Sequence, residues 1–259
     1  MLRHLKKLLP RPTREFIDRT LATERRRREN ACWRGVDDVL RRVDTVDEAA
    51  YAAWKGFEEP EHQIGRFRNM RRIVREIEAG GYPGDVVEFG TWQGLGLCLL
   101  DRCFQGPHAK RFVGIDSFEG LPETSTVWSK GQFNDTSLGS VHATLAAHLR
   151  RTPDYRLIRG WFSDPEVGRQ LREAVRDVAL VHFDADLKSS TTEALALVEP
   201  YLAGRKEPVF FLFDDWGCHP DEVPDAFHEW CGPAADRHGF RAEKIGSTRF
   251  TRYYRLTFA

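Results

Sequence analysis

Acidic residues follow two apolar runs of the chain that lie one structural repeat apart. Asp184 and Asp186 come after the first run, and Asp214 and Asp215 come after the second, with 30 residues between Asp184 and Asp214. Thirty residues is about one strand–helix repeat, so the two runs are expected to be neighbouring strands. Carboxylates at one sheet edge repel each other unless a cation or protons balance them. Oxygen-only donors favour a hard ion, most simply magnesium, with calcium and manganese as alternatives. In a structural alternative, Asp186 caps the next helix and Asp215 accepts backbone amides.

A glycine-rich segment and a later acid indicate a nucleoside ligand. The segment runs from Glu88 to Gly96, and Asp116 lies 22 residues after Gly94. Glycines let the backbone turn sharply and approach a ligand closely, and the N-terminus of the following helix favours negative charge. An acid about 20 residues after such a loop commonly accepts hydrogen bonds from a ribose. These features do not separate NAD from S-adenosylmethionine.

Glu88 favours S-adenosylmethionine over a dinucleotide, because it lies in the strand that leads into the loop. Its carboxylate would repel a pyrophosphate but would help to position a ligand that carries a sulfonium and an amino group. The alternative is a glutamate that binds local backbone amides.

Strands and helices that alternate after residue 84 would position these residues. Continuous apolar strands between amphipathic helices indicate an α/β fold with a mostly parallel sheet covered on both faces. Ligands of such sheets bind beyond the carboxyl ends of the strands, where the acids and the glycine-rich loop fall. Strands are predicted at 86–89, 111–115, 155–158, 178–183, 209–213, 241–245 and 249–258, and helices at 97–104, 140–149, 164–177, 192–202 and near 221–231.

Composition limits the class of protein. The chain has 259 residues, with 39 basic and 39 acidic side chains, 41% hydrophobic and 12% aromatic residues. This composition suits one or two folded domains and argues against a dedicated nucleic-acid-binding protein. The longest apolar run, residues 209–213, is far too short to span a bilayer, and the charged N-terminus does not resemble a secretory signal. Five cysteines without a zinc-type spacing favour a reduced, cytoplasmic chain.

The N-terminal part differs in charge from the rest. Residues 1–30 contain ten basic and four acidic side chains, including the run Arg25–Arg28, which suits either an anionic partner or a solvated helical face. A helix is predicted over 31–54, a break at Pro60 and an amphipathic helix over 66–78. We therefore expect an N-terminal helical extension over residues 1–64 and a catalytic domain over residues 65–259.

Several segments follow one another in the order found in a known family. They are Gly84–Gly90 with Trp92 and Gly94, Asp116–Pro122, Gly160–Ser163, Asp184–Leu187 with Ser189 and Ser190, and Phe213–Trp216. In these segments the chain resembles the macrocin O-methyltransferase (TylF-type) family of S-adenosylmethionine-dependent enzymes, across residues 65–245. The segment Asp116–Pro122 is the most specific of them.

The resemblance implies a Rossmann-like class I methyltransferase fold with a seven-stranded sheet. It also implies methyl transfer from S-adenosylmethionine to a hydroxyl on a sugar of a glycosylated natural product or polysaccharide. A divalent metal is implied, with Asp184, Asp214 and Asp215 as its ligands. The N-terminal segment of such proteins contributes to a lid or to oligomer contacts, so a homo-oligomer is expected.

The resemblance also assigns cofactor contacts. The expected cofactor residues are Glu88, Gly90, Trp92 and Gly94 at the methionine end, Asp116 at the ribose, Ser117 and Phe118 near the adenine, and Gly160 with Trp161.

Three side chains are candidates for the base that takes the proton of the acceptor hydroxyl. The resemblance implies Asp184, although a metal-bound carboxylate is a modest base. Lys188 and His182 are the alternatives, and His182 lies two residues before Asp184 on the same strand face. A packing role for His182 is equally compatible with the sequence. The segment Trp128–Phe133 is expected to close over the acceptor, with a solvated loop as the alternative.

The sequence departs from the family pattern at Gly94–Gly96, at Lys188 and at Trp216. Because Lys188 and Trp216 are expected to border the acceptor pocket, the acceptor is left open. A catechol-type methyltransferase, a non-catalytic nucleoside-binding domain and an NAD-dependent oxidoreductase are the rival readings.

Overall fold

The computed structural model describes residues 58–106, 108–152, 154–218 and 222–259. The chain divides into two compact units, residues 1–64 and residues 65–259. Of the first unit, the described residues 58–64 form the first turns of helix α4. The expectations for the basic run and for a helix over 31–54 lie outside the described residues. Among the described helices, none has the length and apolarity that a membrane span requires.

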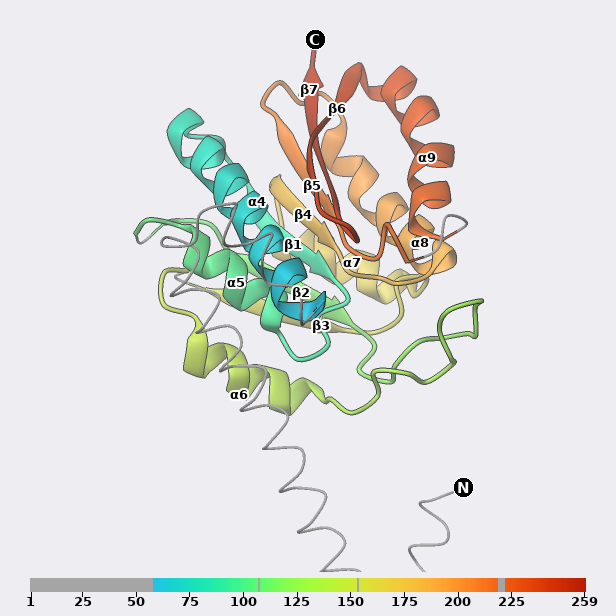
Figure 1. The fold of residues 1–259 in the computed structure, drawn as a ribbon. Helices are drawn as coiled ribbons and strands as arrows, with labels where there is room; N and C mark the ends of the chain where they lie inside the picture. Colours follow the sequence, from blue (N-terminus) through green and yellow to red (C-terminus); the bar gives the residue numbers. More distant parts are fainter. Residues whose placement is uncertain (1–57, 107, 153, 219–221) are drawn as a thin grey trace, which may run out of the picture. The chain divides into compact units, whose positions relative to one another are not determined.

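A seven-stranded sheet forms the centre of the second unit, as Figure 1 shows. Its strand order is β3-β2-β1-β4-β5-β7-β6, in which β7 runs antiparallel to β5 and β6 and the other pairs are parallel. The predicted mostly parallel α/β sheet is confirmed. The strands are β1 (Asp85–Phe89), β2 (Phe112–Asp116), β3 (Tyr155–Arg159), β4 (Val178–Phe183), β5 (Val209–Phe213), β6 (Phe240–Ser247) and β7 (Arg252–Phe258).

Helices cover both faces of this sheet (Figure 1). Helices α7, α8 and α9 pack their apolar residues into one core with the strands, and α4, α5 and α6 lie on the opposite face. The helices are α4 (Glu58–Gly80), α5 (Leu95–Cys103), α6 (Leu138–His148), α7 (Pro165–Ala174), α8 (Lys188–Val198) and α9 (Val223–His238), with a 3-10 turn, η1, at Glu199–Leu202.

The apolar pattern of the sequence accounts for the core. Every residue of β4 and β5 is buried, as expected for central strands of a sheet covered on both faces. The stripe on α4 is also buried, which confirms the amphipathic helix; it consists of Phe67, Met70, Ile73, Val74 and Ile77. The four described cysteines are free thiols.

Several helix boundaries differ from the predictions. Pro60 does not break a helix but lies in the first turn of α4, where a missing N–H costs no intrahelical bond. Helix α8 begins at Lys188 instead of residue 192, and α9 continues through Pro233 to His238. Buried Phe227 and Ala234 on the two sides of Pro233 hold α9 against the sheet, and this packing overrides the local preference to end.

Replacing Phe211 tests how much the sheet centre depends on its aromatic packing. The Phe211 ring is fully buried, with its centroid 5.1 Å from that of Phe183 and 5.7 Å from that of Trp230. Phe211→Ala should lower the free energy of unfolding in urea by about 3–5 kcal/mol, because it leaves a cavity in the core. Val127→Ala is the control, since Val127 is 44% exposed. A loss for Phe211→Ala no larger than that for the control would contradict this account.

Candidate active site at the carboxyl edge of the sheet

The loop after β1 is a tight turn built on glycines. Gly90 has φ 87°, and a Cβ atom at this position would overlap the carbonyl oxygen of Asp184. Gly94 has φ 84°, precedes α5 as its N-cap and donates its N–H to the carbonyl of Thr91 over 2.7 Å. Only glycine accommodates both the close approach and this backbone conformation without strain. The loop therefore reaches the turn after β4 in direct backbone contact.

Asp116 joins the loops after β1 and β2. Its Oδ2 accepts the N–H of Trp92 over 2.7 Å, and its Oδ1 accepts the N–H of Phe118 over 2.6 Å. Burial raises the pKa of Asp116, and these backbone hydrogen bonds oppose the rise. The N–H of Gly160 in turn donates to the backbone carbonyl of Asp116. The structure thus brings predicted cofactor residues of three loops together around Asp116, two through its carboxylate and one through its backbone carbonyl.

The remaining predicted cofactor residues lie in the same loops. Ser117 is buried, and its hydroxyl accepts the N–H of Glu119 over 3.0 Å. Phe118 is buried and has φ 57°. Trp161 is half-buried and accepts the N–H of Asp164 at its carbonyl. Contacts of these residues with a cofactor stay a prediction.

Glu88 and His182 form a buried pair behind this loop, and both are 1% exposed. His182 Nδ1 lies 2.9 Å from Glu88 Oε2, and His182 Nε2 lies 3.3 Å from Asp214 Oδ2. Burial alone would lower the pKa of His182, but the hydrogen bonds with Asp214 and Glu88 outweigh it and raise the pKa to about 9. At neutral pH the imidazole therefore carries a positive charge between the two carboxylates.

Glu88 is held beneath the first turn of α5. A Cβ atom at Gly96 would lie 2.0 Å from Glu88 Oε2, so glycine at this position leaves the space that the carboxylate occupies. Burial raises the pKa of Glu88, and the hydrogen bond from His182 opposes this rise. Glu88 therefore interacts with His182 in this structure, and a contact with the methionine end of a cofactor remains a prediction.

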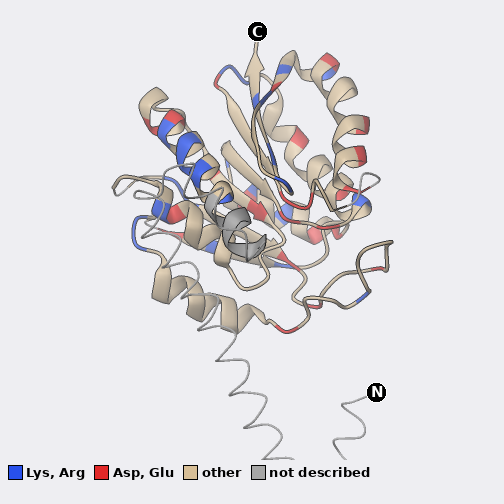
Figure 2. Cartoon of the chain, viewed as in Figure 1, with Lys and Arg blue, Asp and Glu red and all other residues tan. Residues whose placement is uncertain are grey.

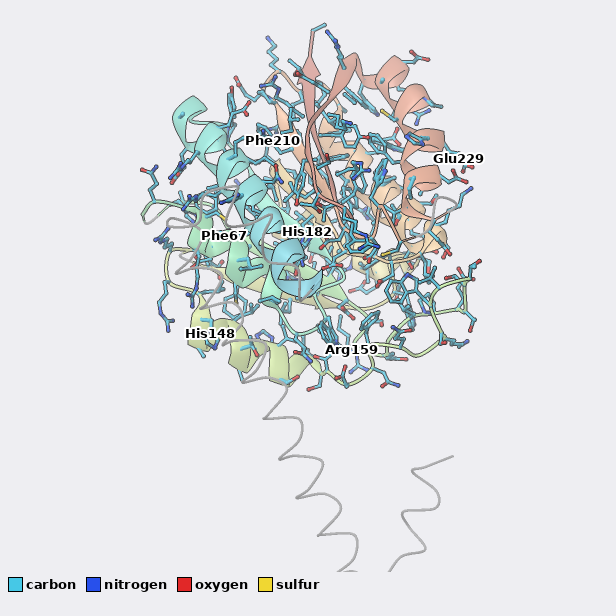
Figure 3. All side chains as sticks on the ribbon, in the orientation of Figure 1. Phe67, His148, Arg159, His182, Phe210 and Glu229 are labelled. Carbon is cyan, nitrogen blue, oxygen red and sulfur yellow. The ribbon has the colours of Figure 1, made fainter. Side chains whose placement is uncertain are left out.

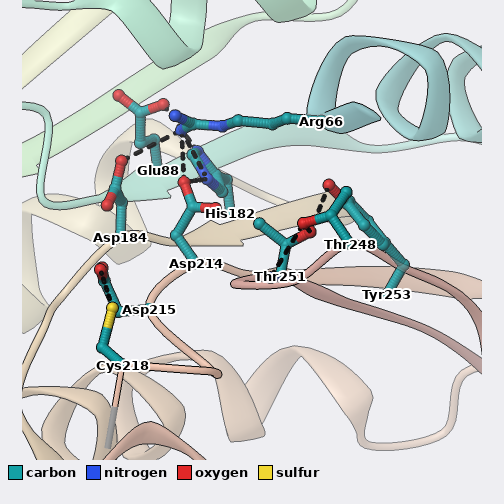
Figure 4. Close-up of polar contacts among 10 residues, drawn as sticks. All are labelled: Arg66, Glu88, His182, Asp184, Asp214, Asp215, Cys218, Thr248, Thr251 and Tyr253. Carbon is teal, nitrogen blue, oxygen red and sulfur yellow. Dashed lines mark hydrogen bonds and ion pairs between the residues drawn. The ribbon is translucent and has the colours of Figure 1, made fainter. Parts of the chain in front are cut away.

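Arg66 of α4 joins Glu88, His182, Asp184 and Asp214 in one cluster of charged side chains, as Figure 4 shows. We call this group the charged cluster. Arg66 Nη2 donates to Asp184 Oδ2 over 3.1 Å and pairs with Asp214 Oδ2 over 2.7 Å. The sequence interpretation missed this arginine, although it carried a signal. Arg66 lies four residues before Met70, in line with the buried stripe of the helix, where a charged side chain needs a partner.

Asp184 and Asp214 meet because their strands are neighbours. Phe183 and Phe213 are paired in the parallel ladder between β4 and β5, so the next residue of each strand emerges at the same edge. The Asp214 side chain is 6% exposed and that of Asp184 is 32% exposed. Asp184 therefore faces the open edge of the cluster, and Asp214 its buried side.

A second pair of carboxylates lies beside the first. Asp186 and Asp215 both have positive φ, 60° and 56°, and share a side-chain hydrogen bond. Burial, together with the charges of Asp184 and Asp214, raises the pKa of Asp215 to about 7. The thiol of Cys218 donates to Asp215 Oδ1 over 3.3 Å. Asp215 is therefore near the cluster but directed toward Cys218 in Figure 4.

Lys188 does not join the cluster. Its ammonium lies 2.6 Å from Glu229 and 3.7 Å from Asp225, both on α9, where Figure 2 shows acidic residues along the helix. Figure 3 places Glu229 on the outer helix and His182 in the middle of the ribbon. The sequence placed Lys188 near the acids because it follows β4 closely, but the first turn of α8 directs it toward α9.

The segment Trp128–Phe133, which was expected to close over the acceptor, packs against the loop after β1. The Phe133 ring lies 5.5 Å from that of Trp92 and 5.6 Å from that of Trp128, measured between centroids. Closure over an acceptor stays a prediction. Trp216, expected at the acceptor pocket, is 9% exposed and packs among core aromatics such as Phe213 and Phe227.

The donor atoms near Arg66 suit a cation. Among the described residues, Asp184 and Asp214 offer carboxylate oxygens that lie within 4.8 Å of each other and of a ring nitrogen of His182, which has no lone pair for an ion while the ring is protonated. Carboxylate oxygens are the donors that hard divalent cations prefer, so the set fits such an ion in its chemistry. One oxygen of each carboxylate already binds the Arg66 guanidinium, so an added cation would lie next to a positive charge.

Comparison with known proteins finds one matching family. Residues 54–231 match the model of macrocin-O-methyltransferase (TylF). These residues include the loop after β1, Asp116 and the four acids after β4 and β5.

Similar proteins and similar solved structures are named as methyltransferases. A tetracenomycin 4'-O-methyltransferase of Streptomyces olivaceus, named for a rhamnosyl substrate, is 30% identical over 183 residues, 65% of this chain and 66% of that protein. The mycinamicin III 3''-O-methyltransferase of Micromonospora griseorubida is 27% identical over 73% of this chain and 75% of that protein. The O-methyltransferase NovP superposes with a TM-score of 0.57 at 23% identity, covering 75% of this chain and 80% of its own. The calicheamicin methyltransferase CalS11 superposes with the same score at 19% identity, covering 86% and 91%. NovP and CalS11 therefore share the α/β fold of this chain.

Titration of His182 should make stability depend on pH. Because its pKa is about 9 when folded and about 6.5 when unfolded, the stabilisation is fully present below pH 6.5 and is lost as pH rises toward 9. The loss should reach up to about 3 kcal/mol in the free energy of unfolding. His182→Gln should remove this part of the slope in urea titrations from pH 6 to 9.5.

The exposed His228 supplies the control, because His228→Gln should keep the slope of the parent protein. An unchanged slope in His182→Gln would show that the buried imidazole does not titrate in this range.

Proposed function

The chain belongs to the macrocin O-methyltransferase (TylF) family, and from this premise we propose that it methylates a sugar hydroxyl with S-adenosylmethionine. The acceptor class that we propose is a glycosylated natural product or a polysaccharide. The match over residues 54–231 is the observation that carries the proposal. The names of the two similar enzymes, which act on a rhamnosyl tetracenomycin and on mycinamicin III, support the choice of a sugar acceptor.

The proposed cofactor lies across the loops after β1, β2 and β3. Asp116 would accept the ribose hydroxyls with the lone pairs that Trp92 and Phe118 leave open. Gly90 and Gly94 would let the methionine end approach the backbone. The aromatic and apolar residues near the loops after β2 and β3, Phe118 and Trp161, would flank the adenine. The convergence of these three loops supports this arrangement.

The acceptor would lie beyond the carboxyl ends of β4 and β5. Asp184 is the carboxylate of the first pair that reaches the open edge, with 32% of its side chain exposed. It would accept the proton of the acceptor hydroxyl while the oxygen attacks the methyl group in line. A divalent cation held by Asp184, Asp214 and Asp215 would, when bound, supply Lewis-acid activation of that hydroxyl.

The other two candidates for the base have different surroundings. His182 is buried behind Glu88 and Asp214, and its pKa of about 9 keeps it protonated at neutral pH. It is therefore better suited to hold the two carboxylates in place. The ammonium of Lys188 is engaged with Glu229. Asp186, which the sequence interpretation left out of the base candidates, adds a carboxylate beside Asp215.

Asp184→Asn should abolish most methyl transfer and leave cofactor binding intact. The change keeps the shape of the side chain but removes its charge and its capacity to accept a proton, so the rate should fall at least about 100-fold. Transfer of a labelled methyl group to a panel of sugars and glycosylated acceptors, including catechols for comparison, measures the rate. Excess EDTA should reduce the rate of the parent enzyme.

Asp154→Asn is the matched control, because Asp154 is an exposed carboxylate at the opposite edge of the sheet. Full activity of Asp184→Asn would refute the role of this carboxylate, and full activity in EDTA would refute the role of the metal.

Asp116→Asn should weaken binding of S-adenosylhomocysteine at least about tenfold, because a charged acceptor for the ribose hydroxyls is lost. Isothermal titration calorimetry measures the affinity, and circular dichroism checks that the loops remain folded. Glu119→Gln, a nearby surface change, should bind like the parent. Equal affinities in all three proteins would place the ribose elsewhere.

A further inference from the structure

Arg66 places a permanent positive charge between two of the proposed metal ligands. One nitrogen, Nη2, lies 2.7 Å from Asp214 Oδ2, 3.1 Å from Asp184 Oδ2 and 3.1 Å from His182 Nε2. The Arg66 side chain is 7% exposed. Removing a guanidinium from water is costly, and the charges of Asp214 and Asp184 are the compensation that keeps it there.

A divalent ion shared by Asp184 and Asp214 would lie beside the Arg66 guanidinium, which already takes one oxygen of each carboxylate. Metal–oxygen bonds are short, about 2.0–2.1 Å for magnesium and 2.3–2.6 Å for calcium, so the ion must take the lone pairs directly. The guanidinium uses Oδ2 of both carboxylates. A positive charge next to the ion would also repel it strongly in a buried site.

Arg66 is held there by its own helix. Its neighbour Phe67 and the next residue of the stripe, Met70, are buried at 3% and 0% exposure. The guanidinium therefore reaches the acids from a segment that the core fixes in place. Displacement requires the Arg66 side chain to move away from the two carboxylates.

We propose that Arg66 is a positioning residue that holds Asp184 and Asp214 together in place of a metal ion and competes with divalent cations for these two carboxylates. The inference rests on the proposed function for its choice of metal ligands. Without a metal, Arg66 keeps the acids assembled at the sheet edge. With a metal, the apparent affinity is lowered by the need to displace the guanidinium.

Binding of Mn²⁺ to the cofactor-free enzyme tests the competition. Arg66→Gln removes the charge that Asp184 and Asp214 share and leaves Asp214 with His182 alone, so its affinity for Mn²⁺ should rise at least about tenfold over the parent protein. Arg66→Lys keeps one charge on a shorter side chain, whose ammonium cannot fully take the place of Nη2 between the two acids, so its affinity should fall between the two. Electron paramagnetic resonance of free Mn²⁺ measures all three.

The rise in melting temperature caused by Mn²⁺ is a second measurement. If Arg66 had only a structural role, this rise would be the same in the parent and in Arg66→Gln. Mn²⁺ should raise the melting temperature of Arg66→Gln by more than it raises that of the parent, because the ion replaces the lost charge. Should Arg66→Gln fold only with Mn²⁺ and not with an equal ionic strength of NaCl, that result also supports the proposal. In that case Arg66→Lys, which keeps a positive charge, is the variant whose Mn²⁺ affinity is compared with that of the parent.

Arg75→Gln is the matched control, since it removes the same charge from an exposed position of the same helix. It should bind Mn²⁺ like the parent. Equal affinity in the parent, Arg66→Gln and Arg75→Gln, including no detectable binding in any of them, would overturn the proposal. Methyl transfer is not measured, so a failure of the proposed enzyme activity would be recognised separately, by the labelled-methyl assay.

Discussion

The balance of charge at the carboxyl edge of the sheet is the constraint on which the candidate site depends. Glu88, His182 and Asp214 are 1%, 1% and 4% exposed, so their charges are withdrawn from water. Such burial is tolerated only when each charge has a close partner of opposite sign. His182 supplies one cation between Glu88 and Asp214, and Arg66 supplies another between Asp214 and Asp184. The network therefore ties the three central strands to α4.

Much of the fold could be predicted from apolar patterning alone. Strands β4 and β5 are continuous apolar runs, a pattern that arises where both sheet faces are covered, and both were placed within a residue of their bounds. The distance between Asp184 and Asp214 along the chain predicted neighbouring strands, which the parallel pairing of β4 and β5 confirms. The edge pair β6 and β7 was less well bounded, because half-exposed strands carry a weaker pattern.

The direction of side chains was harder to predict than the place of their backbones. Lys188 follows β4 closely, but the start of α8 turns it to Glu229. Arg66 is distant in sequence from its partners by more than 100 residues, and only the packing of α4 on the sheet brings them together. The positive φ of Asp186 and Asp215 has no signal in the sequence beyond the tolerance of aspartate for that conformation.

The contact between Gly90 and the carbonyl of Asp184 has a consequence for how such a protein can diversify. The N–H of Asp184 also donates to the carbonyl of Phe89 over 2.8 Å, so main-chain atoms set the separation between the nucleoside loop and the turn that bears the acid. Side chains that border the proposed acceptor site can then be exchanged during evolution while that spacing is retained. Under the proposed function, new acceptors become accessible through changes at the rim, without a change in the main-chain contact between the two loops.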